Sequence, residues 1–400
     1  MRCVWLIGFT GKVYHWLPGA SVKEEMGEQG FAKLKPEQSM EFTSTTLTTP
    51  LSALHRQHGA QMGAWFGCDL PTHFGDWQAE YRALRESVGL VDKNYRAYLE
   101  FTGPDRTRYL NAILTNDVKG LQQNHGTVAL FLNPQGHIQA EIETYALVES
   151  LFCVSYAMIR EQLIPAMDKY IIMDDVTLTD RTEAYATLAL EGPKAAALVQ
   201  KLTGVNLADM DDLEQREVAA RGIAARMGKR SPGGIARAEF LVVREKCAEL
   251  WNVLKEAVRG AGGIPVGYEA LNTVRLEMGI PWFGYDFGEK HIPHEAGLQD
   301  SHISYTKGCY TGQEIVERVR SRGQVNRVRV SLKFEGQTAP EPNSPLSADK
   351  KEIGFVTRVG YSPAINAWIG MGYVRREKAV AGTALTTSNG TARVLDRPTP

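Results

Sequence analysis

The segment 307–314 reads Lys-Gly-Cys-Tyr-Thr-Gly-Gln-Glu and follows neither a helical nor a strand period. Its two glycines, Gly308 and Gly312, permit backbone conformations closed to other residues, so the segment must follow a surface that it contacts. Lys307 supplies positive charge two residues before Cys309, which favours a thiolate and makes Cys309 a candidate reactive thiol. The alternative is that the glycines form a turn, Lys307 is solvated, and a helix opens at Gln313 and Glu314.

Hydrophobic periodicity predicts mixed α and β structure in the part of the chain before this segment. Residues 128–147 read as two strands joined by a polar turn at 133–136. Helical spacing and strand patterns then alternate, which is typical of two α+β units. The expected helices are 76–88, 105–114, 161–170, 193–202 and 248–259, and the expected strands are 176–179, 187–190 and 239–243.

The two ends of the chain differ from this middle. After Glu335 a Gly-, Pro- and Ser-rich stretch marks a loop or a boundary, and the Val-, Gly-, Tyr- and Thr-rich tail predicts a small β-barrel. At the other end Arg2 precedes the apolar residues 3–7, as in a secretion signal, but Gly8 interrupts the apolar run. We expect residues 1–39 to be a misassigned start or an unstructured extension.

Composition excludes several classes of protein. A length of 400 residues allows two or three domains, and a net charge of -1 gives no reason to expect nucleic acid as a partner. The five cysteines are scattered without a Cys-x-x-Cys pair, which argues against a disulfide framework or a zinc site. No apolar run approaches the ~20 residues that span a bilayer, so we expect no membrane partner and a cytoplasmic location.

Several segments together indicate a family. The chain resembles the YgfZ-type folate-binding proteins, relatives of the glycine cleavage T protein, whose signature K-G-C-Y/F-x-G-Q-E is matched at every position of 307–314. The resemblance runs from about residue 49 to the end. The segments that carry it include Thr49-Pro50-Leu51, Phe101-Thr102-Gly103-Pro104-Asp105, Leu114-Thr115-Asn116-Asp117, Leu190-Glu191-Gly192-Pro193, Arg275-Leu276-Glu277-Met278-Gly279, Pro293-His294-Glu295-Ala296-Gly297 and Gly370-Met371-Gly372-Tyr373-Val374.

The resemblance implies a fold and a cofactor. It implies an α+β fold, with two α+β domains and a C-terminal β-barrel arranged like a clover leaf around a tetrahydrofolate pocket. We expect an extension over 1–44, an α+β folate-binding region of two interleaved units over 45–325 and the barrel over 326–400. Folate needs polar groups for its pterin, apolar walls and a cation for its glutamate tail.

The resemblance also implies site residues. Arg275 is the leading candidate for the tail cation, with the alternative that it is a surface helix charge paired with Glu277 or Glu269. Trp282 and Phe283 would form the pocket walls, or belong to the core. The complete predicted folate-binding set is Arg275, Asn116, Trp282, Phe283, Gln313 and Glu314.

Departures from the T-protein pattern bear on the chemistry. T proteins carry an Asp-Asp pair where this chain has Ala140-Glu141, so one carboxylate remains on a longer arm, and transfer geometry is sensitive to shifts of about 1 Å. The T-protein glutamate that holds the pterin has no clear counterpart in 231–240. Phe283 replaces a common tyrosine, and Cys309 replaces an apolar aromatic residue.

Three functions therefore stay open at the level of sequence. The first is a tetrahydrofolate-binding protein that supports iron–sulfur cluster assembly or repair, with Cys309 and Lys307 as the functional pair and cluster proteins as clients. One thiol cannot hold a cluster alone. The second is a folate-dependent aminomethyltransferase or demethylase, with Glu141 as the catalytic carboxylate and a lipoyl carrier protein as partner. The third is a folate-binding regulatory module without chemistry.

Two further groups of residues are weaker candidates. His291, His294 and His302 could suggest a metal site, but Pro293 breaks any shared helical face, so a loop is the favoured interpretation. A basic stripe could receive a polyglutamate tail or an acidic partner, or be a solvated surface. Its members are Arg318, Arg320, Arg322, Arg327 and Arg329.

Overall fold

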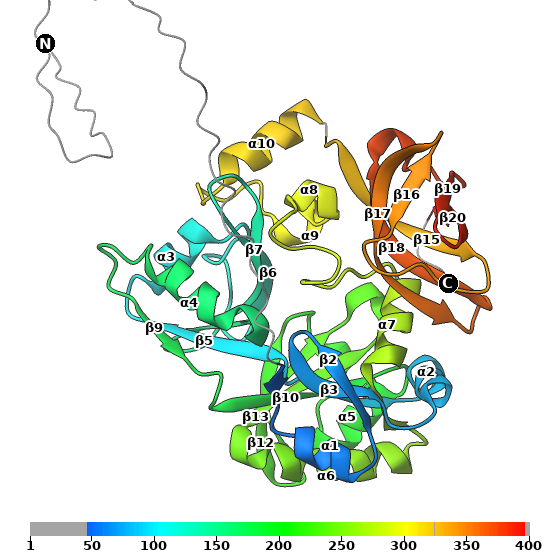
Figure 1. Ribbon diagram of the computed structural model, residues 1–400. Helices are drawn as coiled ribbons and strands as arrows, with labels where there is room; N and C mark the ends of the chain where they lie inside the picture. The colour runs from blue at the N-terminus through cyan, green and yellow to red at the C-terminus, as the bar shows by residue number, and fades with distance from the viewer. Residues whose placement is uncertain (1–45, 324, 397–400) are drawn as a thin grey trace, which may run out of the picture. The chain divides into compact units, whose positions relative to one another are not determined.

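The computed structural model describes residues 46–323 and 325–396 (Figure 1). The interpretation of residues 1–44 concerns residues outside these ranges. Two antiparallel-rich sheets, a small three-stranded sheet and a closed barrel carry the strands. No helix in the described ranges is long and apolar enough to cross a membrane.

The first sheet has the strand order β6-β7-β8-β5-β9. Its strands are β5 (Arg96–Thr102), β6 (Gly126–Leu132), β7 (Ile138–Ala146), β8 (Leu151–Tyr156) and β9 (Thr177–Asp180). Helices α3 (Arg106–Ile113) and α4 (Arg160–Asp168) lie beside it (Figure 1). The Tyr109 ring of α3 contacts Phe101 of β5, and its hydroxyl donates to the Met167 carbonyl of α4. The predicted hairpin is confirmed as β6 and β7, because the Asn133 side chain accepts from the amides of Gln135 and His137 and closes the turn.

The second sheet has the order β11-β12-β13-β10-β4-β14. Its strands are β4 (Gly89–Asp92), β10 (Tyr185–Glu191), β11 (Gln215–Ala220), β12 (Ile223–Arg230), β13 (Arg237–Val243) and β14 (Ile264–Pro265). Helices α5 (Ala195–Thr203) and α6 (Cys247–Gly260) cover it. Leu198, Trp251 and Leu254 from these helices share a buried core with Leu188 and Phe240 from the strands.

A smaller layer adjoins the second sheet. It contains α1 (Ser52–Gln57), α2 (Trp77–Glu86), α7 (Tyr268–Glu277) and the sheet β1 (Leu47–Thr48), β3 (Cys68–His73), β2 (Gln61–Trp65). Asp76 caps the start of α2, because its side chain accepts from the Gln78 amide. Helix α7 is buried on almost all faces. It therefore lacks the repeat of apolar residues on one face by which a sequence reveals a surface helix.

The barrel closes in the order β15-β18-β17-β16-β19-β20. Its strands are β15 (Arg327–Glu335), β16 (Pro345–Ala348), β17 (Lys351–Ser362), β18 (Ala367–Arg375), β19 (Ala384–Thr387) and β20 (Gly390–Val394). The first barrel strand, β15, precedes the Pro-rich stretch after Glu335. That stretch is therefore the loop between β15 and β16, and the barrel does not begin after it. Asn272 and Thr273 of α7 donate to the β17 carbonyls of Val359 and Tyr361 and tie the barrel to the α+β region.

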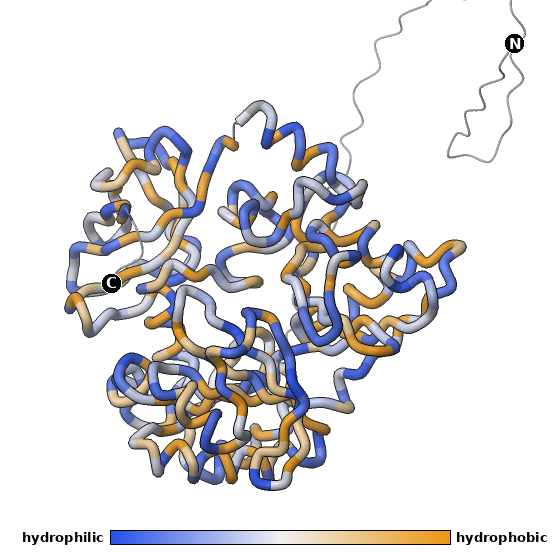
Figure 2. The backbone as a smooth tube through the Cα atoms, turned by 180° about the vertical axis from the view of Figure 1, so that it is seen from behind, coloured by the Kyte–Doolittle hydropathy of each residue, from blue (hydrophilic) through white to orange (hydrophobic). Residues whose placement is uncertain are grey.

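Three short helices connect these parts. They are α8 (Pro293–Ala296), α9 (Gln299–His302) and α10 (Gln313–Arg322). Hydrophobic and hydrophilic stretches alternate along the chain in every part of the described fold (Figure 2). This alternation is expected of elements that bury one face. Two α+β domains and a C-terminal β-barrel are thus present, as predicted.

Candidate functional site

Glu141 lies on β7 and is held by two side chains from other elements. Its Oε2 accepts a hydrogen bond from the Tyr156 hydroxyl at 2.6 Å, and its Oε1 lies 2.9 Å from Nε2 of His302. The Glu141 side chain is 19% exposed, so it keeps access to a bound molecule. Burial and the Glu141 charge raise the pKa of Tyr156 well above its usual value. Tyr156 therefore stays protonated and acts as a fixed donor to this carboxylate.

His302 ends α9 and is oriented by the Leu-Thr-Asn-Asp segment of the resemblance. The Thr115 hydroxyl donates to the His302 carbonyl at 2.6 Å and accepts from the Leu130 amide of β6. The Ser304 amide donates in turn to the Thr115 carbonyl. At the level of sequence His302 is one of three histidines that could suggest a metal site, whereas the structure pairs it with Glu141.

Aromatic rings surround Tyr156, the partner of Glu141. Phe283 stacks on Tyr156 with ring centroids 4.9 Å apart, but it is only 3% exposed and so offers little surface to a bound molecule. Trp282 is partly exposed and packs near Phe66 and Tyr285. Of the two predicted walls, Trp282 has the accessible surface.

Arg275 is not a surface charge and does not pair with Glu277 or Glu269. It is 4% exposed, and its guanidinium forms an ion pair with Asp286 and hydrogen bonds with Asn272. Asp286 also accepts from Thr357 of the barrel at 2.6 Å. Burial lowers the pKa of Arg275, and the Asp286 carboxylate opposes this shift. All of these bonds are internal, so Arg275 joins α7 to the barrel.

A different arginine carries a free charge in this region. Arg358 of β17 lies over the rings of Trp65 and Tyr285, 4.9 and 4.6 Å from their centroids. Within 46–323 and 325–396 it forms no ion pair or side-chain hydrogen bond, and it is half-buried. Arg358 can therefore bind an anion without breaking an existing pair. No motif or spacing in the sequence singles out Arg358.

Lys307 is not solvated and does not point its donors at Cys309. Its ammonium donates to the carbonyls of Asn111, Leu114 and Asn116, which lie in and just after the last turn of α3. An ammonium has three N–H donors, so these three carbonyls occupy all of them. Burial lowers its pKa to about 8. Lys307 therefore completes the hydrogen bonding at the end of α3, and the effect of its positive charge on the Cys309 thiol stays a prediction.

The rest of the segment follows the β6–β7 turn. Gly312 has φ of 82°, and a Cβ there would lie 2.7 Å from the Asn133 carbonyl oxygen. Gln313 and Glu314 begin α10, as the alternative interpretation of the segment has it. Cys309 is an exposed free thiol on the loop that these contacts hold in place.

With this geometry described, comparison with known proteins identifies the family. Residues 51–302 match the GCVT N-terminal domain, and residues 327–399 match the glycine cleavage T-protein C-terminal barrel domain. The chain belongs to the glycine cleavage T-protein family. Similar proteins named aminomethyltransferase include one from Halothermothrix orenii, 28% identical over 84% of this chain and 94% of that protein. Another, from Rubrobacter xylanophilus, is 30% identical over 83% of this chain and 88% of that protein.

A solved structure of the T-protein family has the same fold. The glycine cleavage system aminomethyltransferase T from Bartonella henselae superposes with a TM-score of 0.79 at 22% identity, covering 89% of this chain and 98% of that chain. At this identity the likeness concerns the fold. It agrees with the two α+β domains and six-stranded barrel described above.

Within the T-protein fold, the predicted site residues fall into three groups. Glu141 and Phe283 meet through Tyr156, and Arg275 lies 4.7 Å from the Trp282 ring. The third group lies around the end of α3 and the hairpin tip, and consists of Asn116, Lys307, Cys309, Gln313 and Glu314. Thr115 links the first and third groups, because it contacts His302 and lies next to Asn116.

The other histidines and the basic stripe have varied surroundings in this T-protein fold. His291 stacks on Tyr373 at 4.4 Å, and burial lowers its pKa to about 4, whereas His294 contacts the Tyr305 hydroxyl. Arg327 pairs with Glu295, and Arg329 donates to two carbonyls. The three histidines do not converge on one point, and these two arginines are not simply solvated.

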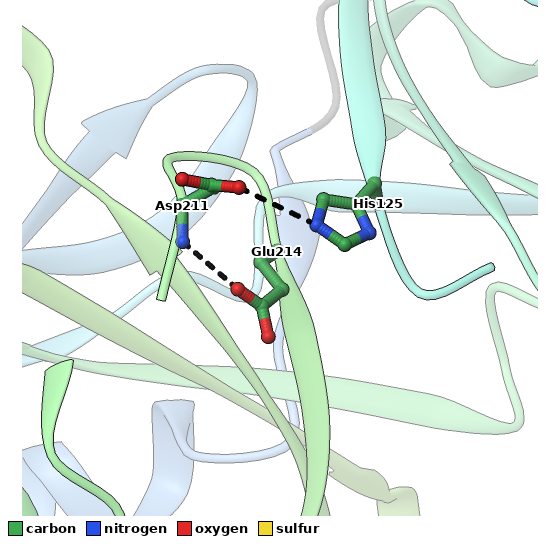
Figure 3. Close-up of side chains that lie close together, drawn as sticks. All are labelled: His125, Asp211 and Glu214. Carbon is green, nitrogen blue, oxygen red and sulfur yellow. Dashed lines mark hydrogen bonds and ion pairs between the residues drawn. The ribbon is translucent and has the colours of Figure 1, made fainter. Parts of the chain in front are cut away.

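Two other surface features of the T-protein fold lie away from Glu141. His125, Asp211 and Glu214 lie close together where β6 and β11 begin (Figure 3). Both Glu214 oxygens already accept, from the Asp211 amide and from Arg216. The backbone bridge between His125 and Glu214 and the His125–Asp211 pair connect the two sheets here. A groove of about 520 Å³, lined by residues such as Phe152 and Leu241, contains none of the predicted site residues.

Proposed function

We propose that this chain binds tetrahydrofolate beside Glu141 and transfers a one-carbon unit to it, as an aminomethyltransferase. The observation that carries the proposal is the Glu141 carboxylate, which Tyr156 and His302 hold in a partly exposed position. It lies on the strand where the resemblance implies a catalytic carboxylate. The names of the similar proteins support the same reaction class.

The side chains around Glu141 suit folate chemically. Glu141 offers acceptor lone pairs to the N–H groups of a pterin, and Trp282 and Tyr285 offer partly exposed aromatic surface. Arg358 offers a guanidinium that has no acid partner in the described part of the chain, so it is a better candidate for the glutamate tail than the internally bonded Arg275. The side-chain NH₂ group of Asn116 donates to the Val128 carbonyl, and its side-chain oxygen accepts from the Asp117 amide. We therefore assign Asn116 to holding the loop.

The residues of the chain would supply acid–base chemistry. Tetrahydrofolate, when bound, supplies the two nitrogens that receive the carbon. In the overall reaction two C–N bonds form between the carbon and the folate nitrogens. The C–S and C–N bonds of an aminomethylated lipoyl carrier break. The two protons lost from the folate N–H groups end on the lipoyl thiol and on the released amine. Glu141 would accept and return these protons, while Tyr156 stays protonated and fixes its position.

The test combines binding and turnover on the same samples. We expect calorimetry to detect tetrahydrofolate binding by the wild type. In Arg358→Ala we expect the affinity for tetrahydrofolate to fall about tenfold or more. Glu141→Gln should keep binding and lose about 100-fold or more in aminomethyl transfer from a lipoyl carrier. Binding without wild-type turnover would contradict the transferase proposal.

Cys309 favours a second candidate function. Its exposed thiol stands on a loop held by Lys307 and Gly312, within the segment that resembles the YgfZ-type proteins. In this candidate the chain binds folate and supports iron–sulfur cluster assembly or repair in client proteins, with Cys309 making a transient contact. Cys309→Ser would then lower client enzyme activity in cells without changing folate binding. If Cys309→Ser changes nothing and no transfer occurs, a regulatory folate module remains.

A further inference from the structure

Glu141 is connected to the surface by two side chains, His302 and Ser301. The Ser301 hydroxyl oxygen lies 2.7 Å from Nδ1 of His302, and Nε2 of the same ring lies 2.9 Å from Glu141 Oε1. Ser301 is exposed, whereas His302 is only 7% exposed. The other acceptor near the Ser301 hydroxyl, the Leu298 carbonyl, is farther away at 3.5 Å.

The direction of each hydrogen bond follows from the chemistry of the groups. An ionised carboxylate can only accept, so with Glu141 ionised both Tyr156 O–H and His302 Nε2–H donate to it. A neutral imidazole with a proton on Nε2 has a lone pair on Nδ1, which therefore accepts from the Ser301 O–H. Thr115 fixes the backbone of His302 and keeps the ring between its two partners.

We propose that Ser301 and His302 form a proton relay between solvent and Glu141. The Ser301 hydroxyl proton moves to Nδ1 as the Nε2 proton moves to Glu141 Oε1, and water restores the proton of Ser301. The result is one proton delivered from solvent to Glu141, and the reverse sequence returns one. The relay rests on the proposed function of Glu141 as the acid–base group. Ser301 and His302 act through Glu141, so they are positioning and relay residues.

The first test does not depend on activity. Nitrogen-15 NMR of the labelled full-length protein reports which ring nitrogen of His302 carries the proton, with His302→Gln to assign the signal. We expect a neutral ring protonated at Nε2. A ring protonated only at Nδ1 would overturn the relay, because it could not donate to an ionised Glu141.

The second test measures transfer kinetics. Ser301→Ala should lower kcat about tenfold and His302→Gln about 100-fold, with little change in KM for folate. Added imidazole buffer should restore kcat in Ser301→Ala, because a diffusible base replaces a missing relay group but not a missing structural contact. Ser321→Ala removes an exposed serine on α10 and should leave kcat unchanged.

The outcomes separate the relay from the proposed function. Wild-type turnover with unchanged kcat in both relay variants overturns the relay alone. No wild-type turnover overturns the proposed transfer and the relay's role in it, and the NMR result then shows whether the hydrogen-bond chain itself is correct.

Discussion

Two arginines within the same region have opposite roles because their partners differ. Arg275 is buried against Asp286, whereas Arg358 rests on aromatic rings without an acid partner among the residues described. Removing one member of a buried pair leaves the other charge uncompensated. An accessible, unpaired cation is available for a ligand.

This contrast predicts different results for the two alanine variants. Arg275→Ala should lower the free energy of unfolding by about 3–5 kcal/mol, because Asp286 stays buried and charged. Arg358→Ala should lower it by about 1 kcal/mol or less and weaken folate binding instead. Urea denaturation and calorimetry on both variants measure the two effects. A stable Arg275→Ala protein with normal folding but no folate binding would reinstate Arg275 as the tail cation.

Lys307 makes a residue-scale prediction of its own. Lys307→Met keeps the length of the side chain but removes three hydrogen bonds to carbonyls at the end of α3. We expect a loss of about 1–3 kcal/mol in the free energy of unfolding, measured by urea denaturation. If Lys307→Met instead has wild-type stability and altered Cys309 alkylation kinetics, the lysine acts on the thiol rather than on α3.

At the scale of elements, the close approach of two turns sets the course of the 307–314 segment. Gly312 packs on the Asn133 carbonyl, and a Cβ on Gly136 of the hairpin would lie 2.9 Å from Ile315 of α10. Neither turn leaves room for a larger residue. The contact explains why a loop without helical or strand periodicity keeps one course.

The two glycines of the segment provide a matched pair for testing this contact. Gly312→Ala should lower the free energy of unfolding by about 2–4 kcal/mol, because it combines a positive φ with a 2.7 Å contact. Gly308→Ala has nothing within 4 Å of the new Cβ and should change stability by about 0.5 kcal/mol or less. Thermal and urea unfolding of both variants measure the difference. Equal effects would mean that the contact with the hairpin is not tight in solution.

The elements also show which structure can be predicted from sequence. The β6–β7 hairpin and α6 follow from local turn chemistry and one-sided hydrophobic spacing. Helix α7 could not be predicted in this way, since it buries Asn272, Thr273 and Arg275 along with its apolar residues. Its polar side chains are satisfied by the barrel and the 280–286 loop, which no local pattern reveals.

At the scale of the molecule, buried ion pairs join the two large sheets. Arg96 of β5 pairs with Glu239 of β13 at 2.7 Å, and Arg230 of β12 pairs with Glu143 of β7 at 2.9 Å. Burial alone would raise the pKa of Glu143, but Arg230 and Arg96 outweigh it and lower the pKa to about 2. For Glu191, burial likewise raises the pKa, but the charges of Arg237 and Lys93 outweigh burial and lower the pKa to about 2.

These lowered pKa values predict acid sensitivity. The unfolded carboxyls titrate near pH 4.5, so their contribution to stability is complete above that pH and is lost as the pH falls toward 2. We expect the free energy of unfolding to drop by a few kcal/mol between about pH 5 and pH 2. Glu143→Gln should lower stability at pH 7 and flatten this slope. Exposed Glu149→Gln is the control, and an identical slope in both variants would contradict the assignment.

The sequence by itself determined the α+β units, the C-terminal barrel and the hairpin. These features depend on periodicity, turn chemistry and backbone conformation, which are local properties of a chain. Only the tertiary structure decided that Glu141 binds His302, that Arg275 binds Asp286 and that Lys307 binds the end of α3. The physical reason is that hydrophobic spacing reports whether a residue is buried, whereas the partner of a buried polar group depends on which distant segments the fold brings within hydrogen-bonding distance.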